Sequence, residues 1–248
     1  MTADPRRWTA RYALLAYGAS WLVIGWVSLG ACLPLGIRMS DGAGLLCIDA
    51  AWLAALVPLY RVGVLRAVDL GLRKSPAGRS LGLALLMLGV ASLFDDVWRS
   101  ALAPGPISNP FSGISDRSMA TIVLTGVAAV VTPAIEEVFF RGLLYRCLRN
   151  RFAVLPSSVM IGVMFGLVHT EYPLGVLPEL AVYGMLACLL YECTGSLLPG
   201  IALNVYLDAG SFEQALTGTS AVVFWGFALL ALVLAARSVR SRTEWLSR

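Results

Sequence analysis

Six polar side chains lie inside stretches of the sequence that are otherwise apolar: Glu136, Glu137 and Arg141 in one stretch, His169 in a second, and Asn204 and Asp208 in a third. Ionisable groups are costly in lipid, so their presence in such stretches marks a candidate functional site. A carboxylate and an imidazole can together activate a water molecule, and an amide can stabilise the oxyanion that forms when the water attacks a carbonyl. His169 is the only histidine of the chain, so this chemistry would depend on it.

The spacing of the first stretch gives its two glutamates different surroundings. In a helix, Glu137 and Arg141 lie one turn apart on the same face, where opposite charges pair. Glu136 lies about 100° around the helix axis and faces elsewhere. We therefore expect Arg141 to neutralise Glu137 and to hold the helix in register, which leaves Glu136 for chemistry. Pro133 precedes the pair and is expected to kink the helix and open backbone groups toward a cavity.

The other two stretches repeat the one-turn spacing. Phe165 and His169 share one helix face, and so do Asn204 and Asp208. Three helices would then each carry one polar face, and such faces avoid lipid by meeting one another. The sequence therefore predicts a common pocket that holds a carboxylate, an imidazole and a carboxamide.

The composition indicates what kind of protein carries these helices. Of the 248 residues, 58% are hydrophobic and only 14% are charged, and the mean hydropathy is +0.77. An ordinary soluble domain has about 25% charged residues, so this composition excludes a soluble enzyme, a disordered chain and a nucleic-acid binder. We predict an all-α, polytopic membrane helix bundle with about eight transmembrane helices. The expected spans are roughly 13–35, 43–64, 81–98, 119–146, 153–171, 175–194, 196–212 and 219–238.

The positions of the basic residues predict an orientation. Most of the 19 Lys and Arg residues fall on one side of the expected spans, and that side is cytoplasmic by the positive-inside rule. Both termini are then cytoplasmic, and His169 lies in the outer half of its span. We expect the pocket to be reached from the extracytoplasmic side or laterally from lipid. Lys74 is the only lysine, and an Arg-rich, Lys-poor chain of this kind is typical of the inner membrane of a bacterium.

Three segments resemble the motifs of one known family. The segment EEVFFRG at 136–142 resembles the EExxxR motif of the CPBP family, and FGLVH at 165–169 resembles its FxxxH motif. YECTGSLLP at 191–199 resembles the short turn before the last motif of the family. These proteins are intramembrane glutamic endopeptidases and include type II CAAX prenyl proteases, Abi and bacteriocin-processing proteins, and myxosortase-like members. The resemblance implies a catalytic core at 119–212 within a single membrane domain, 1–248.

The resemblance also implies roles for individual residues. Glu136 and His169 match the pair that activates water in the family, and Glu137, Arg141 and Phe165 match supporting positions. A later histidine and asparagine stabilise the oxyanion in the family, and this chain has Asn204 and Asp208 at those catalytic positions. Asn204 can still donate a hydrogen bond, whereas an ionised Asp208 cannot.

The function that follows is an intramembrane endopeptidase. It would cleave a peptide bond near the hydrophobic, membrane-anchored tail of a substrate protein, with the lipid bilayer as its surroundings and without nucleic acid. We expect no metal and no cofactor. A single histidine does not supply the HExxH motif of membrane zinc proteases, although four side chains could in principle hold a metal ion: Glu136, Glu137, His169 and Asp208.

Two other functions stay open at this stage. The same polar pocket could bind another membrane span in a non-proteolytic immunity or scaffold protein, and the Asn204/Asp208 departure favours this alternative. The chain could also be a small transporter or proton path, although it shows no inverted repeats. That path would use the remaining acidic residues of the spans, which are Asp49, Asp95, Asp96 and Glu179.

Overall fold

A computed structural model describes residues 10–34, 42–61, 71–73, 75–102, 111–112, 114, 117–169 and 172–216. Within these ranges the regular secondary structure is entirely helical. The elements are α1 (Ala10–Val27), η2 (Ser28–Cys32), α2 (Gly42–Arg61), α3 (Ala77–Leu102), α4 (Met119–Glu136), η4 (Glu137–Tyr145), α5 (Arg146–Arg149), α6 (Val154–Val168), α7 (Leu177–Thr194) and α8 (Leu198–Ala215). The two η elements are π-helical and continue the α-helices before them.

The all-α prediction is confirmed for the described residues, and each of the first seven expected spans coincides with a helix. The eighth, 219–238, lies outside the described residues. Two helices are long and apolar enough to cross a membrane, Ala77–Leu102 and Met119–Arg149. Shorter apolar helices cover Leu14–Gly30, Gly42–Ala54 and Val154–Val168. The number of spans therefore stays a prediction.

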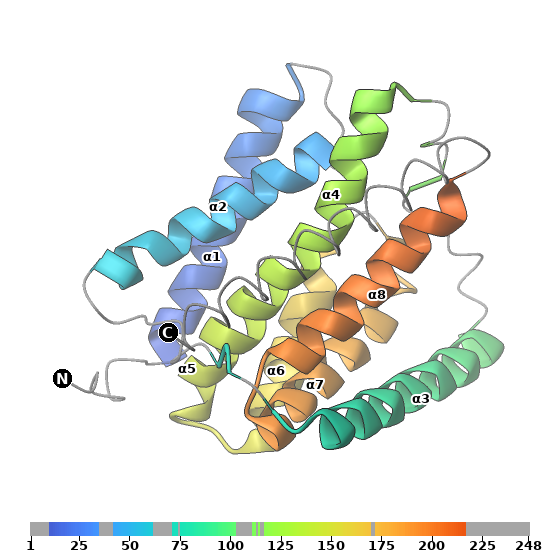
Figure 1. Cartoon of the computed structure of the whole chain (residues 1–248). Helices are drawn as coiled ribbons and strands as arrows, with labels where there is room; N and C mark the ends of the chain where they lie inside the picture. The colour runs from blue at the N-terminus through green and yellow to red at the C-terminus, as the bar shows by residue number, and fades with distance from the viewer. Residues whose placement is uncertain are drawn as a thin grey trace, which may run out of the picture.

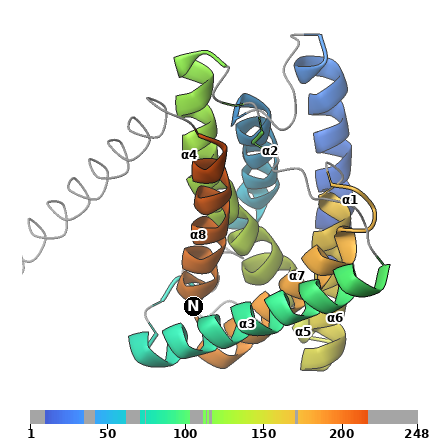
Figure 2. The same ribbon diagram turned by 90° about the vertical axis from the view of Figure 1, so that its right-hand side faces the viewer.

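The long helix formed by α4, η4 and α5 runs through the middle of the bundle (Figure 1). Helix α2 packs between α1 and α4, and α8 packs along α4 on another side. Helices α6 and α7 form a closely packed pair, and α3 crosses over α7 and α8 (Figure 2). The sequence segments that carry Glu136, His169 and Asn204 are thus next to one another in space.

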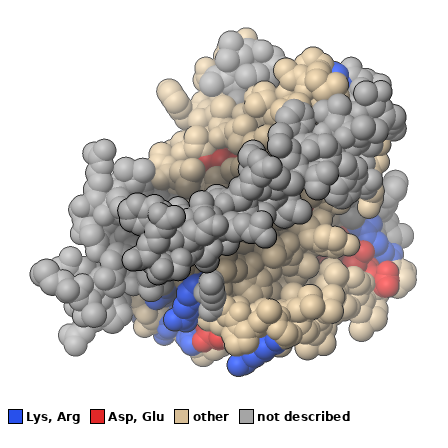
Figure 3. Space-filling view, in the orientation of Figure 1, with Lys and Arg blue, Asp and Glu red and all other residues tan. Residues whose placement is uncertain are grey.

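The outer surface of the bundle is largely apolar, although several polar side chains are buried inside. Helix α3 exposes many large apolar side chains, among them Leu81, Leu85, Leu86 and Leu93. On the face seen in Figure 3 the described surface is mostly uncharged, and most of its charged side chains lie toward the lower and right-hand edges. Apolar surface of this extent fits lipid rather than water.

The core of the bundle is built from η4. Phe139, Phe140, Leu143 and Leu144 are completely buried. Trp52 of α2 stacks on Phe139 with ring centroids 5.5 Å apart. Because this segment is enclosed on all sides, the polar residues next to it have little freedom to turn away from the interior.

Glycines allow α6 and α7 to approach closely. A Cβ atom added at Gly162 would lie 2.3 Å from the carbonyl oxygen of Ala181, and one at Gly166 would lie 2.7 Å from that of Leu177. From the other side, Gly184 makes room for the side chain of Phe165. Small residues spaced by one turn are the usual means by which membrane helices pack closely. This contact fixes where the end of α6, and with it His169, lies against α7.

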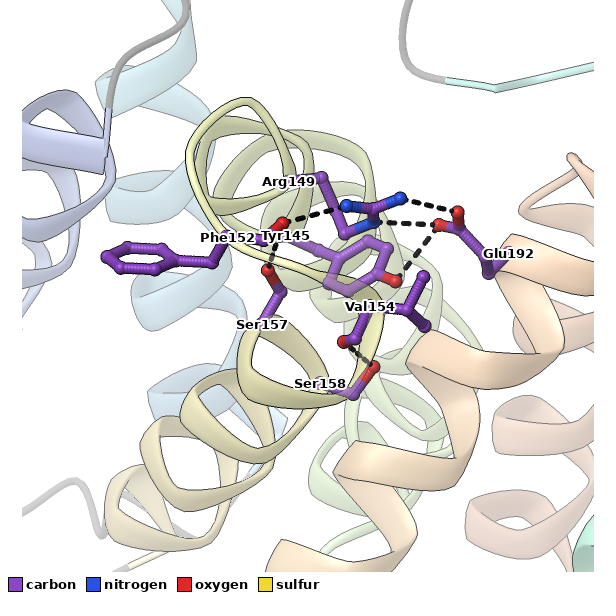
Figure 4. A network of polar contacts seen from close by, with 7 residues as sticks. All are labelled: Tyr145, Arg149, Phe152, Val154, Ser157, Ser158 and Glu192. Carbon is purple, nitrogen blue, oxygen red and sulfur yellow. Dashed lines mark hydrogen bonds and ion pairs between the residues drawn. The ribbon is translucent and has the colours of Figure 1, made fainter.

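A polar network ties the far end of α6 and α7 to α5 (Figure 4). Arg149 pairs with Glu192 of α7, with Nη2 2.9 Å from Oε1. The Tyr145 hydroxyl donates to Oε2 of the same carboxylate at 3.0 Å, and Arg149 Nη1 donates to the carbonyl of Phe152 at 2.8 Å. The Glu192 carboxylate therefore joins α7 to η4 and α5 at the end of the bundle opposite His169.

The turn at 194–197 sets the direction of α8. Gly195 ends α7 in the left-handed conformation with φ 64°, and its N–H donates to the carbonyl of Tyr191 at 2.7 Å. Glycine adopts this conformation without steric cost. The Ser196 hydroxyl donates to the carbonyl of Arg73, and the Leu197 N–H donates to that of Gly71 at 2.9 Å. These bonds fix the start of the helix that carries Asn204.

Candidate active site

Glu136, His169 and Asn204 meet in the interior of the bundle, as the sequence predicts. The Asn204 side-chain amide of α8 donates to Glu136 Oε2 at 3.1 Å. On the other side of the carboxylate, His169 Nε2 lies 3.7 Å from Glu136 Oε1. The three residues come from three different helices, and the carboxylate of Glu136 lies between the other two side chains.

The imidazole of His169 is held in one orientation. His169 follows the last residue of α6, and its Nδ1 lies 2.7 Å from the carbonyl oxygen of Phe165. A carbonyl oxygen only accepts hydrogen bonds, so the proton of a neutral imidazole belongs on Nδ1. The lone pair of Nε2 then points to the side of Glu136. The rings of Phe165 and His169 also pack together, with centroids 4.6 Å apart.

The region around this carboxylate and imidazole is mostly enclosed. The Glu136 side chain is 9% exposed and that of His169 is 15% exposed. Asn204 is buried. His169 is the most accessible of the three.

Glu137 and Arg141 form the predicted ion pair. Arg141 Nη1 lies 3.1 Å from Glu137 Oε1, and the two side chains are 0% and 1% exposed. Arg141 also donates from Nη2 to the carbonyl of Gly184 at 3.3 Å, and its guanidinium lies 4.5 Å from the centre of the Phe165 ring. The supporting residues therefore join η4 to α6 and α7.

A glycine allows α8 to pack against this ion pair. A Cβ atom at Gly200 would lie only 2.7 Å from Glu137 Oε2. Gly200 lies one helical turn before Asn204, so the close approach that it permits also brings Asn204 to Glu136.

The helix changes from α to π at the two glutamates. Helix α4 ends at Glu136 and the π-helical η4 begins at Glu137. Pro133 lies inside α4 and has no N–H to donate to the preceding turn. The Glu137 N–H is shared between the carbonyls of Pro133 and Ala134. Short π-helical segments often occur at functional sites because they turn side chains away from the regular helical faces.

Asp208 lies one turn beyond Asn204 on α8 and is partly buried. Its carboxylate interacts electrostatically with Tyr183 of α7. The contact between Asn204 and Glu136 lies one helical turn away from Asp208 along α8.

Two residues near the site were not predicted to belong to it. Asp49 of α2 is buried, accepts a hydrogen bond from the Thr132 hydroxyl at 2.8 Å and interacts electrostatically with Glu136. The position of Asp49, an acidic residue in an apolar segment, could have indicated that it belongs to the site. Tyr183 interacts electrostatically with Glu136, Glu137 and Arg141 as well as with Asp208. A tyrosine in an apolar helix gave no comparable signal.

The arrangement places a carboxylate next to an imidazole. A single water molecule can donate one hydrogen bond to Glu136 and a second one to His169 Nε2. These two bonds would direct a lone pair of the water oxygen toward an approaching carbonyl carbon. The groups available for this chemistry are the carboxylate of Glu136, the imidazole of His169 and the amide of Asn204.

Comparison with known proteins identifies a matching family model. Residues 118–210 match the family model described as type II CAAX prenyl endopeptidase Rce1-like. The match confirms the family that the motifs at 136–142, 165–169 and 191–199 indicated. No curated protein and no solved structure matches the chain.

Proposed function

We propose, from the premise that residues 118–210 belong to the Rce1-like family of type II CAAX prenyl endopeptidases, that this membrane protein is an intramembrane endopeptidase of the glutamic type. The observation that carries the proposal is the position of the Glu136 carboxylate, 3.1 Å from the Asn204 amide and 3.7 Å from the His169 imidazole. A carboxylate is energetically costly inside an apolar bundle, so its presence there marks a functional site.

In the proposed reaction, Glu136 removes a proton from a water molecule that is also hydrogen-bonded to His169 Nε2. The water oxygen attacks the carbonyl carbon of the scissile peptide bond, and the carbonyl oxygen becomes an oxyanion. The C–N bond then breaks, its electron pair leaves with the nitrogen, and the proton held by Glu136 passes to that nitrogen. The products are a carboxyl terminus and an amine.

The substrate is a protein whose hydrophobic tail is anchored in the membrane. The site lies within the bundle and its most accessible group is His169, so a peptide would enter past His169 from the outer side or laterally from lipid. Removal of an anchor tail, maturation of a bacteriocin and processing of a signal peptide are all reactions of this class.

The surrounding organisation that we propose is a single membrane domain, 1–248, with its catalytic core at 119–212. The chain would lie in the inner membrane of a bacterium with both termini in the cytoplasm, as the distribution of basic residues indicates. Glu137, Arg141 and Phe165 would hold Glu136 and His169 in place without taking part in the reaction.

A non-proteolytic immunity or scaffold protein is the second candidate. Asp208 favours it, because an ionised carboxylate at that position would repel an oxyanion. In this alternative the pocket would bind a polar group of another membrane span, and the carboxylate of Glu136 would contribute a contact rather than a reaction.

A comparison of membrane proteomes distinguishes the two functions. The organism that encodes the chain, deleted for the gene, is complemented with the wild type, with Glu136→Gln or with Glu192→Gln. The second variant makes the same carboxylate-to-amide change at the network of Figure 4, outside the site. We expect a hydrophobic tail to be retained on at least one protein only in the Glu136→Gln strain. Identical proteomes in all three strains, with both variants inserted normally, would support the non-proteolytic alternative.

A further inference from the structure

The hydroxyl of Tyr183 is buried and, among the residues that the structure describes, has no hydrogen-bond partner. Tyr183 lies in the middle of α7, within the segment that packs on α6. A buried hydroxyl without a partner is unfavourable, and native proteins keep very few of them without a reason. A group that binds during function is one such reason.

The phenol ring of Tyr183 is positioned by the same residue that positions the imidazole. Its centroid lies 6.0 Å from that of Phe165, and the Phe165 ring lies 4.6 Å from that of His169. Gly184, the next residue of α7, accepts a hydrogen bond from Arg141. Tyr183 is therefore fixed against two of the supporting residues of the site.

Tyr183 also lies within electrostatic range of the charged groups of the site. Tyr183 interacts electrostatically with Glu136, Glu137, Arg141 and Asp208. These residues come from α4, η4 and α8. The phenol is thus a hydrogen-bond donor near charged groups of three other elements.

Several of the other hydrogen-bond donors near the site are already engaged. The Asn204 amide donates to Glu136 at 3.1 Å, and the Nδ1 of His169 is directed to the carbonyl of Phe165 at 2.7 Å. Arg141 pairs with Glu137 and donates from Nη2 to the carbonyl of Gly184, and its Nε and Nη1 have no hydrogen-bond partner among the described residues. The hydrolysis of a peptide bond nevertheless needs donors directed at the oxyanion. Asn204 keeps one further amide hydrogen, and the phenol of Tyr183 is a donor without an acceptor in the part of the chain that the structure describes.

We propose that Tyr183 is a further catalytic residue, whose O–H donates a hydrogen bond to the carbonyl oxygen of the scissile peptide as it becomes an oxyanion. The inference rests on the proposed endopeptidase function. The phenol keeps its proton throughout, and no covalent bond to Tyr183 forms or breaks. Together with the free amide hydrogen of Asn204 it would supply the oxyanion site that Asp208, as a carboxylate, does not.

The test compares Tyr183→Phe with Tyr206→Phe in the purified full chain. Tyr206 lies on α8 and is exposed on the surface, so its variant makes the same chemical change away from the site. The probe is the protein whose tail is retained in the Glu136→Gln strain. Tyr183→Phe is expected to lower kcat by about 10²–10³-fold, as loss of one oxyanion donor does, with KM nearly unchanged. Tyr206→Phe should cleave at the wild-type rate.

Thermal unfolding separates catalysis from a structural role. Since the hydroxyl has no partner among the described side chains and backbone, its removal should leave the midpoint of unfolding unchanged or raise it. A Tyr183→Phe protein that cleaves at the wild-type rate would overturn the inference. So would one that loses activity in proportion to a lowered unfolding midpoint, because the hydroxyl would then hold an internal water or stabilise the bundle.

A second measurement uses a phosphinic peptide built on the identified cleavage site. Its tetrahedral, charged centre resembles the oxyanion, whereas the uncleaved peptide does not. Tyr183→Phe should weaken binding of the phosphinate by the same factor as kcat and leave binding of the peptide unchanged. Equal affinity of both proteins for the phosphinate would contradict the inference. If no tail is retained in the Glu136→Gln strain, the proposed function itself is wrong, and the role of Tyr183 falls with it.

Discussion

The Nε2 atom of His169 lies 3.7 Å from Oε1 of Glu136, which is too far for a direct hydrogen bond but within reach of one shared water molecule. The Nδ1 atom of the same ring is held by the carbonyl of Phe165 at 2.7 Å. Both contacts act on one ring, so the bond at Nδ1 sets the direction in which Nε2 faces the carboxylate.

Replacing His169 with alanine removes one of the two groups that orient this water. We expect His169→Ala to lower the rate of tail cleavage by about 10²–10⁴-fold, the usual contribution of a positioned acid–base group. The measurement is a pulse–chase experiment that follows removal of the tail from the substrate protein in membranes. Asn150→Ala is a matched control, since it shortens an exposed polar side chain far from the site. Equal rates for wild type and His169→Ala would exclude a role of the imidazole in catalysis.

The ion pair of Glu137 and Arg141 should determine stability rather than the chemical step. Glu137→Gln leaves a completely buried guanidinium without its carboxylate, a change that costs about 3–5 kcal/mol in folding stability. Glu137→Gln combined with Arg141→Met removes both charges and should be less destabilising than Glu137→Gln alone. Unfolding in detergent, followed by loss of helical signal, measures both variants. Losses that simply add in the double variant would contradict a coupled pair.

Close packing of α6 on α7 should be required for activity. Gly162→Ala places a Cβ 2.3 Å from the Ala181 carbonyl oxygen, and such overpacking costs about 1–3 kcal/mol. Because α6 must then move away from α7, His169 would shift relative to Glu136 and cleavage should slow. Gly89→Ala on α3 is the control, since nothing lies within 4 Å of the added Cβ. Both changes favour a helix equally, so the difference in cleavage rate reports the packing alone.

The sequence predicts local relationships well in this chain. Glu137 and Arg141 are four residues apart, and helix geometry alone brings them together at 3.1 Å. The helices themselves follow from runs of apolar residues that end at prolines, glycines and charged residues. The meeting of Glu136, His169 and Asn204 was also predictable, because polar faces in a membrane bundle must face inward.

Contacts between distant segments were not predictable in the same way. Arg99 of α3 pairs with Glu179 of α7 at 2.5 Å, and nothing in the sequence indicated this partner for Glu179. Asp49 likewise finds Thr132 on another helix. A single sequence contains no periodicity that specifies which helices become neighbours, so these pairs depend on the packing of the whole bundle.

The direction in which the site opens can be tested by labelling. Tyr172 follows His169 by less than one turn and is partly buried. We expect Tyr172→Cys, in a chain whose own cysteines are replaced, to react with a membrane-impermeant thiol reagent from the extracytoplasmic side. Arg151→Cys at the exposed loop before α6 should react only from the cytoplasmic side. Labelling of position 172 exclusively from the cytoplasm would reverse the proposed orientation.

The most direct test of the whole account is hydrolysis of the identified tail substrate by the purified chain in the presence of a metal chelator. Glu136 and His169 are proposed to activate water without a metal, so the wild type should cleave at an undiminished rate. Glu136→Gln, inserted and folded like the wild type, should show no cleavage above the uncatalysed background. Cleavage by Glu136→Gln at the wild-type rate, or loss of wild-type activity that returns on addition of a divalent metal, would contradict the central claim.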